Sequence, residues 1–286
     1  HYPDQDYLAV MDDIYLPDTQ SYNGQRLMDV TKFEYSYKTM DIEAAARAQG
    51  DRSQFIKEEK VQVYPDTTVW IKDFSYSYNE PMHNDYFWHD AYGAYPVVGV
   101  SWKQAKAFCQ WRTMYHNAYR KEKKRHFVNS YRLPNEAEWE YAARGGLIQK
   151  TYPWGDDICV GGKHLCNIWQ GDFPDHNTQQ DGYVGTAPVK SFKPNHYGLY
   201  NMVGNVWEWC SDWFSSDHSI VEINENPKGP PRGTNKCMRG GSYLCHESYC
   251  NRYRVAARSS NTPDSSTGNL GFRCVKESSA NPYRGS

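Results

Sequence analysis

The chain has 286 residues, with 32 basic and 34 acidic side chains and a formal net charge of −2. This balance disfavours a nucleic-acid partner, and no stretch reaches the ~18 consecutive apolar residues of a transmembrane helix. Aromatic residues make up 15% of the chain, against only nine leucines. We therefore expect a core built from rings, not a leucine-packed helical bundle, in one large domain or two small ones.

Two early stretches place aromatic residues at every second position. These are residues 33–37 (FEYSY) and 74–78 (FSYSY), and this period is typical of half-buried strands with an aromatic face. Good helix formers ending before Gly50 predict a helix over 42–49. We treat residues 1–60 as an N-terminal layer or insertion, made of an aromatic strand and a helix.

Residues 95–100 (YPVVGV) predict a buried strand that leads into a helix over about 102–119. Ser101 begins that helix with a capping box, and Asn135 does the same for a second helix over 135–144. From 147 onward Gly and Pro turns dominate, so the C-terminal half should be rich in loops. Because ordering the backbone costs about 1–2 kcal/mol per residue, we expect cross-links or bound cations there.

Eight cysteines permit four disulfides in 105 connectivities, or fewer bridges and a working thiol pair. Cys245 and Cys250 lie five residues apart, beside Ser242 and His246. Such a pair could form a local disulfide, a redox pair or a soft-metal site for Cu(I) or zinc. Zinc fits less well, since a structural zinc site needs four ligands and no second pair has suitable spacing.

Oxygen-rich turns surround Asn167, Asp181, Asn201 and Glu208. Interleaved carboxylates, amides and small residues suit calcium, although ordinary Asx turns explain the same pattern. His83 and His89 resemble a metal pair but have no acidic or Cys partner in a motif. The chain lacks a Walker loop, a GxGxxG sequence and a GxSxG elbow, which disfavours nucleotide-dependent and serine-hydrolase chemistry.

Several strings of the sequence are informative together, over about 96–275. They are RLPNEAEWEYAARGG, YPWG, CNIWQGDFP, DGYVGTAPVKSFKPNHYGLYNMVGNVWEWCSDW and RGGSYLCHESYCNRYRVAARSSNTPDSSTGNLGFRC. These strings resemble one family, the formylglycine-generating enzymes or sulfatase-modifying factors. The resemblance implies an α+β, C-type-lectin-like fold with little regular secondary structure. This agrees with the loop-rich C-terminal half.

The resemblance also implies a chemistry for the thiol pair. In the family, the cysteines that match Cys245 and Cys250 bind Cu(I), and a substrate cysteine in a Cys-x-Pro-x-Arg segment of a sulfatase is the third sulfur ligand. With O2, hydrogen is removed from the substrate Cβ and the resulting thioaldehyde hydrolyses to formylglycine. By the same matching, Ser242 and His246 line the site and Arg258 and Asn269 bind substrate.

Calcium ligands and disulfides follow from the same resemblance. One expected calcium site uses Asn167, Ile168, Asp181 and Tyr183, and the other uses Asn201, Gly204, Val206 and Glu208. Cys109 and Cys274 match a family disulfide. A second family disulfide is absent, since Ala143 and Val255 occupy its positions. We predict Cys159–Cys166 and Cys210–Cys237 as replacements.

The first 95 residues resemble a different group of proteins. They lack the family's usual opening strand and look like gliding-motility or type IX secretion lipoproteins, which share the fold but are structural ring components of the cell envelope. We therefore expect a catalytic domain over 61–286, with a non-catalytic ring protein as the alternative. The start, HYPDQDYLAVMDD, does not look like a signal peptide, so we expect either a cytosolic chain or a mature product. Disulfides and the resemblance favour a secretory or extracytoplasmic location.

Overall fold

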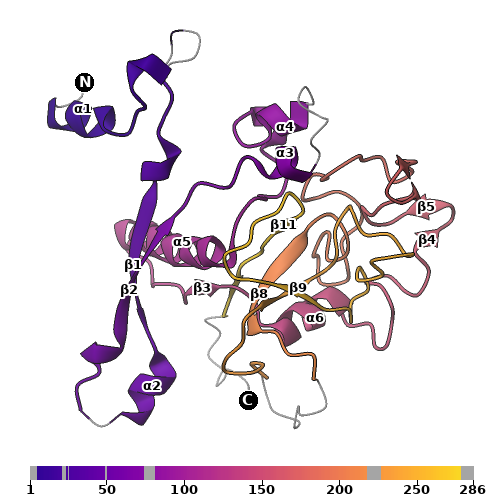
Figure 1. The fold of residues 1–286 in the computed structure, drawn as a ribbon. Helices are drawn as coiled ribbons and strands as arrows, with labels where there is room; N and C mark the ends of the chain where they lie inside the picture. Colours follow the sequence, from indigo (N-terminus) through magenta and orange to yellow (C-terminus); the bar gives the residue numbers. More distant parts are fainter. Residues whose placement is uncertain are drawn as a thin grey trace. The chain divides into compact units, whose positions relative to one another are not determined.

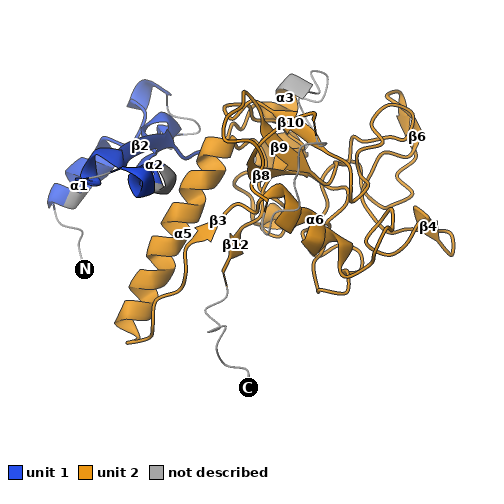
Figure 2. Ribbon diagram, turned by 90° about the horizontal axis from the view of Figure 1, so that it is seen from below, with its two compact units in different colours: residues 1–64 blue, residues 65–286 orange. Residues whose placement is uncertain are grey.

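A computed structural model describes residues 5–20, 24, 26–48, 50–73, 81–217 and 227–277. The chain divides into two units, His1–Tyr64 and Pro65–Ser286, which Figure 2 colours separately. Helices and short strands alternate with long irregular connections, as expected for a loop-rich α+β protein (Figure 1). No helix within the described ranges is both long enough and apolar enough to cross a bilayer.

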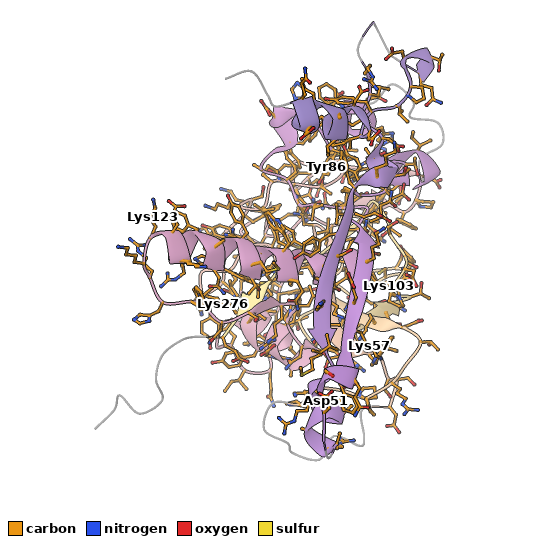
Figure 3. All side chains as sticks on the ribbon, turned by 90° about the vertical axis from the view of Figure 1, so that its left-hand side faces the viewer. Asp51, Lys57, Tyr86, Lys103, Lys123 and Lys276 are labelled. Atoms are coloured by element: carbon orange, nitrogen blue, oxygen red, sulfur yellow. The ribbon has the colours of Figure 1, made fainter. Side chains whose placement is uncertain are left out.

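The first unit is built on a two-stranded antiparallel ribbon. Strand β1 (Glu34–Met40) pairs with β2 (Ile56–Gln62), and helix α2 (Ile42–Arg47) lies between them in sequence. Figure 3 labels Asp51 and Lys57 near one end of this ribbon. The other elements of the unit are α1 (Gln5–Asp12) and three 3-10 turns, η1 (Asp18–Gln20), η2 (Val30–Lys32) and η3 (Ser53–Phe55).

The prediction of an aromatic strand near residue 33 and a helix after it is confirmed. In β1 the rings of Tyr35 and Tyr37 stack with centroids 5.6 Å apart, and Asp41 caps α2 by accepting from Ala44 N. The partner strand β2 was not predicted, because IKEEKVQ has no clear apolar alternation. The expected strand over 74–78 lies outside the described residues.

A four-stranded sheet of order β10-β9-β8-β11 forms the centre of the second unit. Its strands are β8 (Trp207–Trp213), β9 (Lys236–Arg239), β10 (Ser259–Asn261) and β11 (Leu270–Gly271). Only β11 runs parallel to its neighbour, β8. Trp139 and Trp209 are among the largest fully buried side chains, which confirms a core built from rings.

Helices and short strands surround this sheet. They are α3 (Val69–Asp73), α4 (Pro81–Asp85), η4 (Asp90–Tyr92), α5 (Trp102–Glu122), β3 (Tyr131–Arg132), α6 (Glu136–Arg144), β4 (Cys159–Val160), β5 (Lys163–His164), β6 (Gly171–Asp172), β7 (His176–Asn177) and β12 (Val275–Lys276). The longest strand after residue 147 is β8, with seven residues. The loop-rich character predicted for this half is confirmed.

The predicted long helix α5 and the predicted short helix α6 are both present, with the predicted caps. Ser101 and Gln104 form a capping box at α5, and Asn135 and Glu138 form one at α6. Helix α6 ends at Gly145, whose φ of 57° is the left-handed conformation that favours glycine at a helix C-terminus. These helices are marked locally in the sequence because their end groups are satisfied by neighbouring side chains.

The predicted strand over 95–100 is wrong, and its predicted burial holds only from Val98 to Val100, since Val97 is exposed. Val98 and Val100 are buried, but the segment is irregular. Gly99 has a φ of 68°, and a Cβ there would lie 2.4 Å from the carbonyl oxygen of Asp66. The backbone of Gly99 bonds to Asp66 and Thr267 in two different loops, so its hydrogen bonds are satisfied without a sheet.

Candidate active site

The candidate site begins where β9 ends in the Arg239-Gly-Gly-Ser242 turn. Gly240 and Gly241 have φ values of 98° and 73°. A Cβ on Gly241 would lie 2.8 Å from the Cβ of Tyr253, so the close approach of that residue also requires glycine. The turn leads the chain from the central sheet directly into Ser242.

Two successive turns then bring the predicted thiols together. Cys245 N donates to the carbonyl of Ser242 at 2.9 Å, and Cys250 N donates to that of His246 at 2.8 Å. The sulfur atoms of Cys245 and Cys250 lie 2.8 Å apart. Both cysteines are buried, at 1% and 6% exposure. Spacing in sequence and geometry in space therefore agree for this pair.

The pair shares one proton unequally. The hydrogen bond from Cys245, together with the backbone near Arg252, lowers the pKa of Cys250 to about 7 against the opposing effect of burial. The same hydrogen bond and burial raise the pKa of Cys245. The first negative charge of the pair is therefore favoured on Cys250 over Cys245.

Ser242 is oriented by Asn269, as expected for two residues lining one site. Asn269 Nδ2 donates to Ser242 Oγ at 3.0 Å, and Leu244 N donates to the same oxygen at 3.3 Å. With both lone pairs engaged, the Ser242 hydroxyl can donate its own proton, and Cys245 Sγ lies 3.9 Å away. Thr267 fixes Asn269 in turn by donating to its Oδ1 at 2.8 Å.

His246 and Arg258 occupy different surroundings. The His246 ring contacts Ser248 Oγ at 2.8 Å, at the partly exposed side of the thiol turn. Arg258 instead bonds Glu136 through two nitrogens and donates to the Ser215 carbonyl at 2.7 Å. It lines a cavity of about 700 Å³ with Glu136 and residues 227–231. A substrate-binding role for Arg258 stays a prediction.

The donor set at the thiol turn suits a soft metal of low coordination number. Two adjacent sulfur donors select Cu(I), and no group of three or more His, Cys, Asp or Glu residues that could hold a metal occurs in the part of the chain described here. Cys245 and Cys250 therefore fit a two-thiolate site open to a further ligand. His83 stacks on Trp70 and His89 caps η4, so neither histidine contributes to such a cluster.

Comparison with known proteins identifies the family of the chain. A family model for the sulfatase-modifying factor enzyme 1-like domain matches residues 52–278. The chain belongs to this family. It is 56% identical over 183 residues to the formylglycine-generating enzyme of Streptomyces coelicolor, covering 64% of this chain and 53% of that protein.

Other similar proteins match different shares of this chain. The inactive Cα-formylglycine-generating enzyme 2 of Bos taurus is 32% identical over 270 residues, covering 85% of this chain and 78% of the relative. Among solved structures, Treponema denticola variable protein 1 matches with a TM-score of 0.50 and 28% identity, covering 64% of this chain and 71% of that one. The chain spans about half the length of the formylglycine-generating enzymes that it matches.

At the first expected calcium site, two of the oxygens converge. The Nε2 atom of Gln170 donates both to the Ile168 carbonyl and to Asp181 Oδ2, the latter at 2.8 Å. Burial raises the pKa of Asp181, so a cation that replaced this amide would relieve an electrostatic cost. Asn167 is buried beside them, and Tyr183 N donates to Asp181 Oδ1 at 3.0 Å. These two oxygens suit a hard cation, whereas the Asn167 amide donates to the Gly185 carbonyl at 2.8 Å, and the site stays a prediction.

At the second expected site the carboxylate already has cationic and N–H partners. Glu208 accepts from Trp139 Nε1 at 2.7 Å and from Arg273 Nε at 2.6 Å on Oε2, and from Arg273 Nη2 at 2.5 Å on Oε1. Asn201 Nδ2 donates to the Pro188 carbonyl at 3.2 Å. A calcium ion would have to share Glu208 with Arg273, so this arrangement fits the ion less well. Gly204 and Val206 lie on the same turn, and the site stays a prediction.

All eight cysteines are free thiols in the structure. Cys109 on α5 and Cys274 before β12 have sulfur atoms 3.4 Å apart. Cys159 contacts His164, and Cys237 donates to Glu136 at 3.2 Å. Cys166 and Cys210 are buried. The three bridges expected from the sequence stay predictions.

Two residues that the sequence did not single out connect the parts of this site. Gln170 links the oxygens of Ile168 and Asp181. Asn205 accepts from Ala187 N at 2.8 Å through its side chain and from Tyr243 N at 2.9 Å through its carbonyl. Asn205 has a φ of 66°, in the left-handed region that Asn adopts more readily than most residues, and its place after Gly204 was the only hint in the sequence.

Proposed function

We propose that this chain is a formylglycine-generating oxidase that acts on a cysteine in a Cys-x-Pro-x-Arg segment of a sulfatase, with O2 as oxidant and Cu(I) as cofactor. The observation that carries the proposal is the buried thiol pair, with sulfur atoms 2.8 Å apart, beside a hydroxyl held by Asn269. The name and 56% identity of the Streptomyces coelicolor relative support it. An extracytoplasmic location goes with this proposal.

Bound Cu(I) would supply one-electron chemistry with O2, and Cys245 and Cys250 would be its protein ligands. Cys250 is prepared for that role, because its pKa of about 7 provides thiolate at neutral pH. Cys245 must lose its proton when metal binds, so metal affinity should rise with pH. The Ser242 hydroxyl, oriented by Asn269, can donate toward the Cys245 sulfur and stabilise the charge left there.

Calcium has a supporting role in this proposal. Asp181 and the Ile168 carbonyl would bind an ion in the segment that runs to Trp169, whose N–H donates to the Cys245 carbonyl at 3.0 Å. A cation there would fix one wall of the thiol turn without taking part in the reaction.

The test is product formation. The reduced chain, loaded with Cu(I) in the presence of oxygen, is incubated with a peptide containing Leu-Cys-Thr-Pro-Ser-Arg, and the peptide is examined by mass spectrometry for the aldehyde. We expect aldehyde from this peptide and none from its Cys→Ser counterpart. An unchanged cysteine peptide after copper loading has been verified would contradict the proposal.

One alternative has a specific observation in its favour. The inactive relative from Bos taurus matches 85% of this chain, whereas the Streptomyces coelicolor enzyme matches 64%. This coverage favours a non-catalytic chain, and the resemblance of the first 95 residues to envelope lipoproteins adds assembly with a ring partner to the alternative. Isolation of the chain in a large ring, together with copper-loaded protein that does not turn over, would favour it.

A further inference from the structure

Helix α5 presents one face of large, exposed side chains. Phe108, Trp111, Tyr115 and Tyr119 recur at intervals of three or four residues, so they share one face of the helix. Each is between 41% and 59% exposed, and Met114 beside them is 63% exposed. The ring centroids of Phe108 and Trp111 lie 5.5 Å apart, and those of Trp111 and Tyr115 lie 5.1 Å apart. We call these five residues the outer face of α5.

Another side of α5 is anchored to the second unit. Cys109, Thr113 and Asn117 follow one another at intervals of four residues, and Cys109 is buried. Tyr131 N donates to Thr113 Oγ1 at 2.8 Å, and Val128 N donates to Asn117 Oδ1 at 2.8 Å. These contacts fix the rotation of the helix about its axis. The outer face therefore stays turned away from the core.

Basic residues accompany the outer face. Residues 102–127 contain eight Lys and Arg side chains and one acidic side chain, Glu122, whereas the whole chain has a net charge of −2. Five of the eight lie within 120–125, which we call the basic end of α5. Phe127 follows the basic end and is exposed. Figure 2 shows α5 extending outward from the rest of the second unit, and Figure 3 labels Lys123 at its outer end.

This combination of side chains indicates the kind of partner. A contiguous exposed apolar face rimmed by polar residues marks a site for a protein or a membrane, and the basic end requires that partner to be anionic. Trp and Tyr rings are the side chains enriched at the headgroup level of a bilayer. The long stems of Lys and Arg can lie on an apolar surface while their charges reach phosphates. A row of rings along a projecting helix also suits contact with a broad surface.

We propose that the outer face and the basic end of α5 dock this chain on the surface of an anionic lipid bilayer. The helix lies along the surface, the rings enter the headgroup layer, and the cations of 120–125 bind lipid phosphates. Docking is peripheral, because the anchored side of α5 stays packed on the second unit. None of these residues belongs to the Cys245–Cys250 turn, so this proposal and the proposed oxidase activity can fail independently.

The test is co-sedimentation of the full chain with lipid vesicles. One set contains phosphatidylcholine alone, and the other contains about one-third phosphatidylglycerol, both at about 0.1 M salt. We expect at least about tenfold more protein in the pellet with the anionic vesicles, and release of most of it at about 0.5 M salt. Equal binding to both vesicle types would overturn the recognition of anionic lipid. A chain that stays in solution with the anionic vesicles would overturn the proposal and leave an acidic protein surface as the occupant.

The role of the rings is tested by changing two of them together. Trp111→Gln with Tyr115→Gln removes two exposed rings and keeps good helix formers, so binding to anionic vesicles should fall about tenfold. The matched control is Tyr141→Gln with Tyr197→Gln, two exposed rings 5.6 Å apart elsewhere in the second unit. Melting temperatures are measured first, so that unfolding is not mistaken for lost binding. Equal losses in the two double variants would overturn the role of the outer face.

The role of the basic end is tested by reversing charge. Lys121→Glu with Lys124→Glu should abolish sedimentation with anionic vesicles at about 0.1 M salt, because it places like charges against the lipid phosphates. Lys190→Glu with Lys193→Glu changes the net charge by the same amount on another exposed segment and should keep binding within about threefold. If both double variants lost binding equally, net charge alone would explain the attraction and the docking surface would be wrong.

Discussion

Two thiol pairs of the second unit have sulfur atoms in contact, 2.8 Å apart for Cys245–Cys250 and 3.4 Å apart for Cys109–Cys274. In each pair the shared hydrogen bond raises the pKa of one thiol and lowers that of the other. Their positions in the chain differ greatly, since the residue numbers of the first two cysteines differ by 5 and those of the second two by 165.

This difference in sequence separation distinguishes a thiol pair suited to a reaction from a pair suited to a stabilising cross-link. Closing a turn of five residues constrains the unfolded chain little, whereas joining residues 165 apart constrains it strongly. Cys245 also has a hydroxyl at 3.9 Å that Asn269 orients. Cys109 instead lies on the buried side of α5, a helix whose ends Figure 3 marks with Lys103 and Lys123. Contact between thiols is therefore not enough to define a function, and the surroundings decide.

The two thiol pairs should differ most in their effect on activity. Cys245→Ser or Cys250→Ser removes one of two expected thiolate ligands, so aldehyde formation should fall at least about 100-fold. The double variant Cys109→Ser with Cys274→Ser should keep turnover within about threefold below its melting temperature. Peptide mass spectrometry measures both, and equal losses in the two sets would erase the distinction.

The largest loss of stability is expected when the ion pairs of Arg239, next to the thiol turn, are removed. Arg239, 1% exposed, pairs with Glu136 at 3.0 Å and with Glu140 at 2.5 Å, one residue before the glycines. Arg239→Met leaves two carboxylates short of a partner and should cost about 3–5 kcal/mol in urea unfolding. Arg144→Met breaks a more exposed pair with Glu140 and should cost under about 1 kcal/mol. Similar costs for both variants would contradict the burial argument.

The Cys109–Cys274 pair should matter for stability when it is oxidised. Closing this long loop should raise the free energy of unfolding by about 2–4 kcal/mol. Thermal unfolding of oxidised and reduced protein, with the Cys109→Ser and Cys274→Ser double variant as control, measures the gain. If oxidised and reduced protein melt together after mapping has confirmed the bridge, the pair has no cross-linking role.

A pH titration sharpens the contrast at the reactive pair. Because the pKa of Cys250 is lowered to about 7, its alkylation in the reduced, metal-free protein should be fast above pH 7 and slow as the pH falls through that value. Cys245→Ala removes the donor, so the midpoint should move up toward the ordinary thiol value of about 8.5. A midpoint that does not move in this variant would exclude the proton-sharing arrangement.

The last prediction concerns the effect of calcium on stability. An ion bound only to the folded protein at 100 times its dissociation constant adds about 2.7 kcal/mol, a shift of several degrees in a protein this large. A chelator should therefore lower the melting temperature of the unchanged chain. Asp181→Asn should abolish most of that response, whereas a full response in this variant would exclude the first site.

The sequence predicted the elements whose ends are determined by residues close in the chain. The ends of α5 and α6 were readable because Ser101 and Asn135 cap their own helices. Strand β2 was not, since its place depends on pairing with β1 and not on its own pattern. The wrong strand at 95–100 has the same origin, because the conformation of Gly99 is set by Asp66 and Thr267.

The residues of the candidate site also fall into those that the local sequence predicts and those that only the fold brings together. Ser242, Cys245 and Cys250 lie in one short segment, so their proximity follows from the spacing. Asn269 was matched by resemblance, and the parallel pairing of β11 with β8 explains how it reaches the site. The partner of Arg258, Glu136, lies 122 residues away, so only the fold shows that this arginine serves an ion pair. Gln170 was missed because its two oxygen partners come from separate turns.

Copper binding tests the central claim most directly. Cu(I) is titrated anaerobically into the reduced chain against a chromophoric chelator, with Cys245→Ser and the Cys109→Ser, Cys274→Ser double variant in parallel. The assignment predicts one tightly held Cu(I) in the unchanged chain and in the double variant, and loss of that binding in Cys245→Ser. Copper retained by Cys245→Ser and lost from the double variant would contradict it.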